Sequence, residues 1–153
     1  MEIIKFNFPF LEFDNKNFAY PYLNGLYCSK ALYQKNGKVY LMKHFPFSII
    51  IPEEIEFTNK PPVNYSLRIR LEWLSGLLDG FENNVISGTI QFLLEVKKLL
   101  NTLQTDCIII NKLYLEITSY SNLIQLGLKT RIANIENRVD NRKPITISNT
   151  VSY

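Results

Sequence analysis

Two segments of the sequence share one pattern and lie 51 residues apart. Residues 22–28 and 73–79 both begin with an aromatic residue followed by Leu, a small polar residue, Gly and Leu, and both are predicted to be helical. Each segment places a lone glycine, Gly25 or Gly76, inside a helix, where glycine costs about 1 kcal/mol relative to alanine. A close approach of two helices would account for that cost, so we expect Gly25 to face Gly76. The alternative is two unrelated core helices that each tolerate a glycine.

The helix around Gly76 has clear boundaries in the sequence. Ser66 is a suitable N-cap, because its hydroxyl can accept a hydrogen bond from the first helical turn, and Gly80 can end the helix. Leucines recur between them at spacings of four, three and four residues, at Leu67, Leu71, Leu74 and Leu78. This spacing predicts a helix over residues 66–80 with one apolar face.

Residues 1–62 are predicted to form the first half of the domain. Proline fits best in a first helical turn, so the helix around Gly25 is expected to begin at Pro21. Asn36 and Gly37 between two strand-like runs are a strong hairpin signal. Pro46 and Pro52 favour an irregular edge strand or loop over residues 45–57. The predicted elements are a strand within 1–17, a helix over 21–29, hairpin strands over 31–35 and 38–43, and an irregular edge strand or loop over 45–57.

Residues 63–137 are predicted to form the second half. The segment over residues 81–89 is short and polar and is expected to form turns. The predicted elements are the helix over 66–80, a helix over 89–103, hairpin strands over 107–110 and 113–117, and a short helix over 121–126. Ser119 or Ser121 is the expected cap of that last helix, and Gly127 its C-terminal stop. Residues 138–153 form a polar tail that is expected to be only partly ordered.

The composition is that of an ordinary soluble domain, with 153 residues, 46% hydrophobic and 20% charged. No apolar run reaches the roughly 18 residues needed to cross a bilayer. The N-terminus lacks the succession of charged, apolar and small-residue regions that is typical of a signal peptide. We therefore expect a soluble, intracellular protein with no membrane association. Cys28, Cys107 and the single histidine, His44, do not match a zinc site or a Cys–His catalytic pair, so no cofactor is expected. The net charge of +3 permits nucleic-acid binding without indicating it.

The two glycine-containing segments resemble the signature helices of the LAGLIDADG (dodecapeptide) homing endonucleases, especially those embedded in inteins. Residues 70–80 resemble the second signature helix, and residues 23–29 resemble the first. The resemblance continues through residues 92–103 and 126–130, so that Phe18 to Arg131 align with the family in order. It implies an α+β, pseudo-two-fold fold in which the signature helices pair at the centre and antiparallel strands form a saddle on DNA.

In active members of this family, an acidic residue at the eighth position of each signature helix holds a divalent metal ion for phosphodiester hydrolysis. The corresponding residues here are Lys30 and Phe81. A lysine repels a cation and a phenylalanine offers it no ligand, so neither a catalytic residue nor a metal site is expected. Glu82 lies one residue late, which rotates a helical side chain by about 100°, and it has no acidic counterpart. Asp79, at the sixth position, is expected to be a polar group at the helix end.

The sheets of the saddle are expected to be reduced. About nine residues separate Gly80 from Ile90, which is too short for two long strands and a turn. The first hairpin keeps basic residues interleaved with aromatic ones, which can contact phosphates and bases. These nucleic-acid-binding candidates are Lys30, Tyr33, Lys35, Lys38, Tyr40 and Lys43. The alternative interpretation is an ordinary solvent-facing strand surface.

Two functions are compatible with these observations. One is a catalytically inactive relative of the family that is retained for nucleic-acid binding, with DNA as the inherited ligand and further contacts from a basic tail. The other is a structural or protein-interaction subunit, for example of a viral assembly, in which the same core is a scaffold. A protein partner would then contact the apolar residues Phe45, Phe47, Ile49, Ile50 and Ile51.

Overall fold

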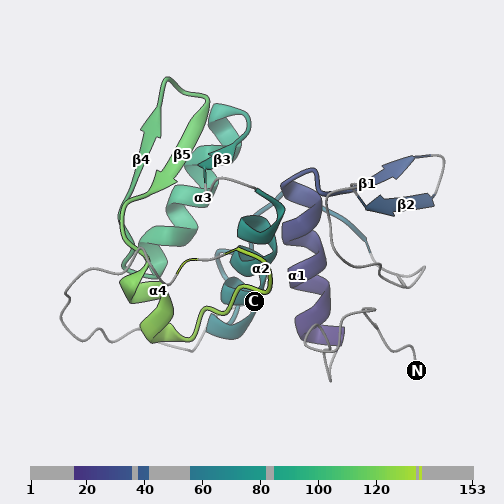
Figure 1. Cartoon of the computed structure of the whole chain (residues 1–153), viewed down its shortest axis with the longest axis horizontal. Coiled ribbons are helices and arrows are strands. Elements are labelled where there is room, and N and C mark those ends of the chain that lie inside the picture. The colour runs from purple at the N-terminus through teal and green to yellow at the C-terminus, as the bar shows by residue number, and fades with distance from the viewer. Residues whose placement is uncertain (1–15, 36–37, 42–55, 82–84, 134, 136–153) are drawn as a thin grey trace.

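The computed structural model describes residues 16–35, 38–41, 56–81, 85–133 and 135 of the chain. In chain order the elements are α1 (Lys16–Cys28), β1 (Leu32–Lys35), β2 (Lys38–Leu41), α2 (Leu67–Gly80), β3 (Val85–Ser87), α3 (Ile90–Thr102), β4 (Cys107–Ile110), β5 (Tyr114–Ile117) and α4 (Ser121–Leu126). Helices α1 and α2 lie side by side at the centre (Figure 1). The β1–β2 hairpin lies on one side of this pair, and the remaining elements lie on the other. The described part is therefore α+β with short antiparallel sheets.

Helix α1 begins earlier than predicted. It starts at Lys16 and contains Pro21 in its interior, so the prediction of a start at Pro21 is wrong. Pro21 is the sixth residue of the helix, where its missing N–H removes one of the first intrahelical hydrogen bonds. Complete burial of Ala19 and Tyr22 in the same turns offsets this loss. The strand predicted within residues 1–17, ending near Pro9 or at Asp14 and Asn15, lies outside the described residues.

Helix α2 agrees with the prediction. The hydroxyl of Ser66 accepts a hydrogen bond from the N–H of Ile69 at 3.4 Å, which satisfies one N–H of the first turn. At the other end, the N–H of Phe81 donates to the carbonyl of Leu78 at 3.2 Å. Most of the helix is buried, including three of the four predicted leucines, Leu71, Leu74 and Leu78. The helix is therefore packed on nearly all sides between α1 and the second half of the chain.

The first hairpin also forms as predicted. Strands β1 and β2 pair in antiparallel register, with Leu32 opposite Leu41 and Lys35 opposite Lys38. Asn36 and Gly37, which are predicted to form the turn, lie outside the described residues. So do Lys43, residues 45–55 of the predicted apolar edge, and the tail over 138–153.

The prediction of turns over residues 81–89 is wrong at Val85–Ser87. These residues form β3, which pairs with β5 and creates a three-stranded sheet of order β3-β5-β4. Ile86, opposite Leu115 in this pairing, is fully buried. Two apolar residues between polar neighbours, Val85 and Ile86, are a weak local signal, and burial against a strand nearly 30 residues later decides their conformation.

The helices and strands after β3 lie close to their predicted positions. Thr89 caps α3 through a hydrogen bond of 3.2 Å from the N–H of Phe92. Gly127 ends α4 with a φ of 104°, in the left-handed region that glycine adopts readily. The predicted serine cap of α4 is wrong, because Tyr120 occupies the cap position and makes no capping hydrogen bond from its side chain.

The hydrophobic core joins α2 to α3 and to the three-stranded sheet. Its largest fully buried side chains in this part include Trp73, Leu77, Leu93 and Tyr120. The apolar side of α3 and the inner face of the sheet pack together, so α2 stands between this unit and α1. Among the described residues, no helix is both long enough and apolar enough to cross a membrane.

Candidate functional site

The two repeated glycines lie at the crossing of α1 and α2. A Cβ placed on Gly25 would lie 2.1 Å from the carbonyl oxygen of Trp73 and 2.6 Å from the nitrogen of Leu77. A Cβ placed on Gly76 would lie 2.0 Å from the carbonyl oxygen of Tyr22 and 3.1 Å from the nitrogen of Leu26. Each glycine thus faces the residue three before and the residue one after the other glycine. The contacts are reciprocal, which is the relation that a local two-fold axis between the helices produces.

The C-terminal ends of the two helices also meet. A Cβ on Gly80 would lie 1.7 Å from the hydroxyl oxygen of Ser29, and these residues occupy equivalent positions of the repeat. Lys30 and Phe81, the residues at the family's acidic positions, follow directly. Lys30 is exposed and has a φ of 71°, whereas Phe81 is half-buried and extended. The end of the helix pair therefore carries one cation and one aromatic ring.

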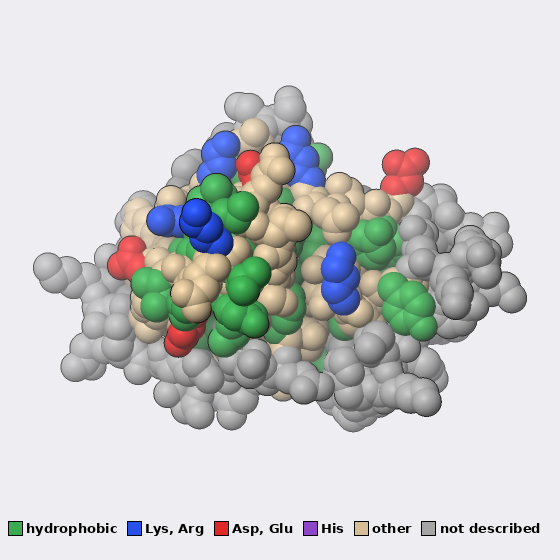
Figure 2. Space-filling view, turned by 90° about the horizontal axis from the view of Figure 1, so that it is seen from above, with side chains coloured by type: hydrophobic (Ala, Val, Ile, Leu, Met, Phe, Trp, Pro, Cys, Tyr) green, Lys and Arg blue, Asp and Glu red, His purple; other side chains and the backbone are tan. Residues whose placement is uncertain are grey.

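Figure 2 shows the face of the molecule at this end of the helices. Among the described residues, lysine and arginine side chains are scattered over it between apolar and neutral ones, and a few carboxylates interrupt them. They do not form one continuous basic patch. The described part of this face therefore attracts a polyanion only modestly at long range. Binding of nucleic acid there must depend on specific contacts from individual side chains.

Each central helix holds a later segment of the chain through equivalent positions of the repeat. In α1, the amide oxygen of Asn24 accepts a hydrogen bond from the N–H of Thr58 at 2.9 Å, and the Cys28 thiol donates to the Thr58 carbonyl at 3.3 Å. In α2, the hydroxyl of Ser75 donates to the carbonyl of Lys129 at 2.8 Å. Asp79, the equivalent of Cys28, binds the residues just after Lys129.

The carboxylate of Asp79 is buried and fully used as an acceptor. One oxygen accepts from the hydroxyl of Tyr22 at 2.6 Å and from the N–H of Arg131 at 3.0 Å. The other accepts from the N–H groups of Ile132 at 3.0 Å and Ala133 at 2.9 Å. Burial and the charge of Asp79 raise the pKa of Tyr22 well above its usual value. Asp79 is thus a structural clamp between both central helices and segment 131–133.

The equivalent pair in the other half is Trp73 and Cys28. Burial raises the pKa of the Cys28 thiol to about 12, and the neighbouring Trp73 side chain and Lys30 lower it by less. Tyr22 and Asp79 join α1 to α2 by a hydrogen bond, whereas Trp73 and Cys28 are buried neighbours whose indole N–H has no hydrogen-bond partner among the described residues. In neither pair is the polar group exposed, so both belong to the helix interface.

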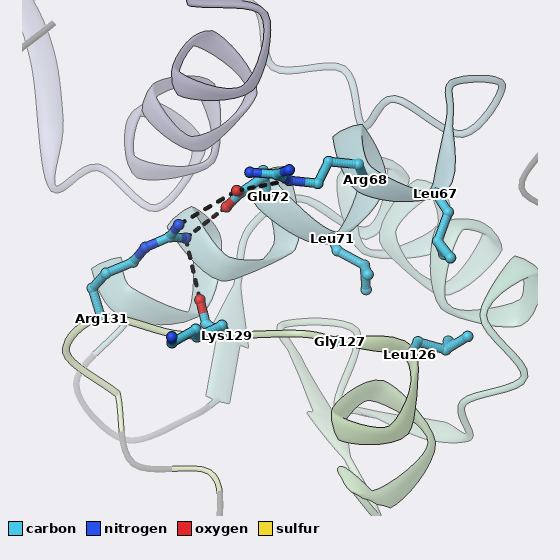
Figure 3. A pocket seen from close by; sticks show the side chains of 8 residues that line it. All are labelled: Leu67, Arg68, Leu71, Glu72, Leu126, Gly127, Lys129 and Arg131. Atoms are coloured by element: carbon cyan, nitrogen blue, oxygen red, sulfur yellow. Dashed lines mark hydrogen bonds and ion pairs between the residues drawn. The ribbon is translucent and has the colours of Figure 1, made fainter. Parts of the chain in front are cut away.

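A charged cluster borders a hollow on the side of α2 that faces segment 126–131 (Figure 3). The guanidinium of Arg131 donates to the carboxylate of Glu72 at 2.6 Å and to the hydroxyl of Ser75 at 3.1 Å, and it lies 5.0 Å from the ring centre of Tyr22. Arg68 contacts the same carboxylate at 3.4 Å. The hollow has a volume of about 450 Å³ and is lined by Leu67, Arg68, Leu71, Glu72, Leu126, Gly127, Lys129 and Arg131. Because Glu72 is paired with two arginines, this cluster fixes segment 129–131 and offers no nucleophile or proton-transfer pair.

The hairpin candidates for nucleic-acid binding are brought together only in part. Tyr33 lies opposite Tyr40, and Lys35 lies opposite Lys38, so these four positions share one face of the hairpin. Tyr33 is 39% exposed, while Leu32 on the other face is fully buried. The face with the four positions is therefore the outer one. Lys30 lies just before β1, and Lys43 lies outside the described residues.

One surface feature is absent from the sequence prediction. The outer face of the three-stranded sheet carries Ile108, Ile110 and Tyr114, which are 50%, 36% and 42% exposed. By register, the other positions on this face are Val85, Ser87 and Glu116, so it carries no lysine or arginine. The sequence indicates a hairpin strand over 107–110, but only the three-dimensional arrangement shows that two of its three isoleucines are exposed.

No group of three or more histidine, cysteine, aspartate or glutamate side chains in the described part of the chain is arranged to hold a metal ion. Neither a protein-family model nor a curated protein nor a solved structure matches the sequence or the fold. The case for a function therefore depends on the internal repeat and on the surfaces around the helix pair.

Proposed function

We propose that this chain is a catalytically inactive LAGLIDADG-like protein that binds nucleic acid. The observation that carries this proposal is the reciprocal contact of Gly25 and Gly76, since it relates two helices of the same sequence pattern by a local two-fold. An accidental contact between unrelated helices has no reason to repeat its distances in both directions. The helix pair supports a pseudo-two-fold fold with halves at 1–62 and 63–137.

Further equivalent positions support the same relation. Asn24 and Ser75 each bind a returning segment of their own half, and Ser29 meets Gly80 at the helix ends. These pairs have the same offset as the glycines, so the correspondence extends over two helical turns. A single degenerate motif would not predict it.

The replaced acids exclude the family's metal chemistry at the helix ends. Hydrolysis of a phosphodiester by this mechanism needs carboxylates that hold the metal and lower the pKa of the attacking water. With Lys30 and Phe81 in those positions, we expect no cleavage of DNA in Mg²⁺ or Mn²⁺. The exposed ammonium group of Lys30 can instead pair directly with a phosphate, so binding should not require a divalent metal ion.

The first hairpin is the proposed second contact. Its outer face presents positions Tyr33, Lys35, Lys38 and Tyr40 together, and lysines pair with phosphates while tyrosines stack on bases. The hairpin begins directly after Lys30, so both contacts lie beside the same end of α1. DNA is therefore expected to lie over the helix ends and the hairpin.

Substitution of Lys30 tests this proposal. Lys30→Gln should reduce the salt slope of log K for duplex DNA by about 0.9, the value expected for one lost phosphate contact. Lys129→Gln is the matched control, because Lys129 is also exposed but borders the hollow beside the N-terminal half of α2. Equal slopes for both variants and the wild type would contradict a role for the helix ends. Cleavage that disappears in Glu82→Gln would contradict the absence of catalysis.

A second candidate function is that of a structural or protein-interaction subunit. The apolar outer face of the three-stranded sheet favours it, since a nucleic-acid-binding saddle needs polar and basic side chains there. Under this hypothesis, the protein would bind duplex DNA no better than a neutral control protein near about 150 mM salt. Purification from the native source would then recover a partner, which is lost in Phe47→Asp.

A further inference from the structure

Strand β4 is an edge of the three-stranded sheet that no other described element covers. It has β5 as its only hydrogen-bonded neighbour, and no other described strand or helix lies along its outer side (Figure 1). Edge strands in soluble proteins usually carry charges, prolines or bulges that prevent further pairing. The four residues of β4 are Cys107 and three isoleucines, so the strand has none of these features.

The hydrogen-bonding groups that β4 directs outward follow from its register. The N–H of Thr118 donates to the carbonyl of Asp106 at 3.2 Å, which makes residues 106 and 118 a hydrogen-bonded pair in the antiparallel ladder. Such pairs alternate, so Ile108 and Ile110 direct their peptide groups toward β5. The peptide groups of Cys107 and Ile109 must then point to the open edge.

These two outward residues make the edge complementary to itself. In an antiparallel pair of two β4 strands centred on Ile108, Cys107 of each copy lies opposite Ile109 of the other. The two-fold axis creates two such Cys107–Ile109 pairs, and in each pair the two residues exchange two N–H···O=C hydrogen bonds. All outward N–H and carbonyl groups of β4 are therefore used. The exposed side chains of the two Ile108 residues meet at the axis, where the strands approach most closely.

The charges that flank β4 favour the same arrangement. Asp106 precedes the strand and Lys112 follows it in the hairpin loop, and both are exposed. An antiparallel two-fold pair brings the Asp106 end of one copy beside the Lys112 end of the other. A parallel pair would instead place like charges together, which costs free energy.

We propose that β4 binds β4 of a second copy of this chain, forming a continuous six-stranded sheet across a two-fold axis at Ile108. The proposal is independent of nucleic-acid binding, because the edge lies on the other side of the helix pair from the first hairpin. A short edge buries little surface, so the dimer should be weak and reversible. Sedimentation of the wild type from about 1 μM to about 500 μM should show a monomer–dimer equilibrium.

Single cysteines test the register. In a Cys107→Ala background, Ile108→Cys places two thiols opposite each other at the axis, where a disulfide can form. Ile110→Cys is the matched control, because it lies on the same exposed face but opposite Asp106 of the other copy. Under mild oxidation, Ile108→Cys should form the cross-linked dimer at least about tenfold faster than Ile110→Cys.

Hydrogen exchange provides a measurement without any substitution. The N–H groups of Cys107 and Ile109 should become protected as the concentration of the wild type rises, while those of Ile108 and Ile110 are protected throughout. A wild type that stays monomeric over the whole concentration range would overturn the proposal. Dimers with equal cross-linking of the two variants, or with unprotected N–H groups at Cys107 and Ile109, would place the contact elsewhere and also overturn it.

Discussion

Replacing Gly76 with alanine adds one methyl group at the crossing of α1 and α2. The new Cβ would lie 2.0 Å from the carbonyl oxygen of Tyr22, and Cβ atoms in real proteins stay at least 3.0 Å from such atoms. The obstacle is backbone, which cannot rotate away. The two helices must therefore separate by about 1 Å.

The cost of this separation follows from what the crossing buries. Tyr22, Leu26, Trp73 and Leu77 lie next to the glycines and are at most 1% exposed. Their burial contributes about 6–12 kcal/mol, and a gap of about 1 Å forfeits about a quarter to a half of the contact energy. Alanine regains about 1 kcal/mol through helix propensity, so the net loss of stability is about 0.5–5 kcal/mol.

Thermal unfolding followed by circular dichroism measures this loss. For a chain of this size, Gly76→Ala should lower the Tm by about 2–20 °C, and Gly25→Ala should behave alike. The double variant should cost less than both single costs combined, because one separation of the helices accommodates both methyl groups. Gly88→Ala is the control: it is exposed, and its Cβ would meet only the movable ring of Phe92. A Tm that is unchanged or raised in Gly76→Ala would refute the close crossing.

Two further predictions concern the polar groups between the central helices. Asp79→Asn keeps the shape of the clamp but replaces one acceptor oxygen with an NH₂ group, so either the N–H of Arg131 or the N–H groups of Ile132 and Ala133 face a donor, and the protein should lose about 2–3 kcal/mol of stability. Tyr22→Phe, which removes one donor only, should cost less in the same urea titration, and equal costs would contradict the clamp. The pKa of Cys28 is raised from 9.0 to about 12, so the folded state keeps a proton that the unfolded state loses, and stability should fall as the pH rises from about 9 toward 12. Cys28→Ala should make this fall shallower, although Tyr22 still contributes above its usual pKa; an unchanged pH dependence would show that the thiol is not buried in solution.

Local signals in the sequence are sufficient to predict most elements on the C-terminal side of residue 66. Ser66, the leucine spacing and Gly127 act within one or two helical turns, so their effects can be recognised without the fold. Pro21 misleads for the opposite reason. Its preference for a first turn is worth less than the burial of Ala19 and Tyr22, and that burial depends on α2.

The candidate site is less accessible to sequence reasoning, because its contacts join distant residues. Asp79 can be predicted as a polar helix end, but its hydrogen bonds to residues 131–133 span more than 50 positions. The pairing of Arg131 with Glu72 has no local signal either. The Gly25 and Gly76 contact is the exception, since the repeat itself indicates which two positions correspond.

Binding of duplex DNA over a range of salt concentrations, in buffer without divalent metal ions, is the decisive measurement for nucleic-acid binding. The wild type should bind with an affinity that falls steeply with salt. The combined substitution of Lys35, Lys38 and Lys43 by glutamine should reduce the slope of log K by up to about 2.7, or about 0.9 for each phosphate contact removed. Wild-type protein that binds no better than a neutral control protein near about 150 mM salt would contradict nucleic-acid binding as the function of this chain.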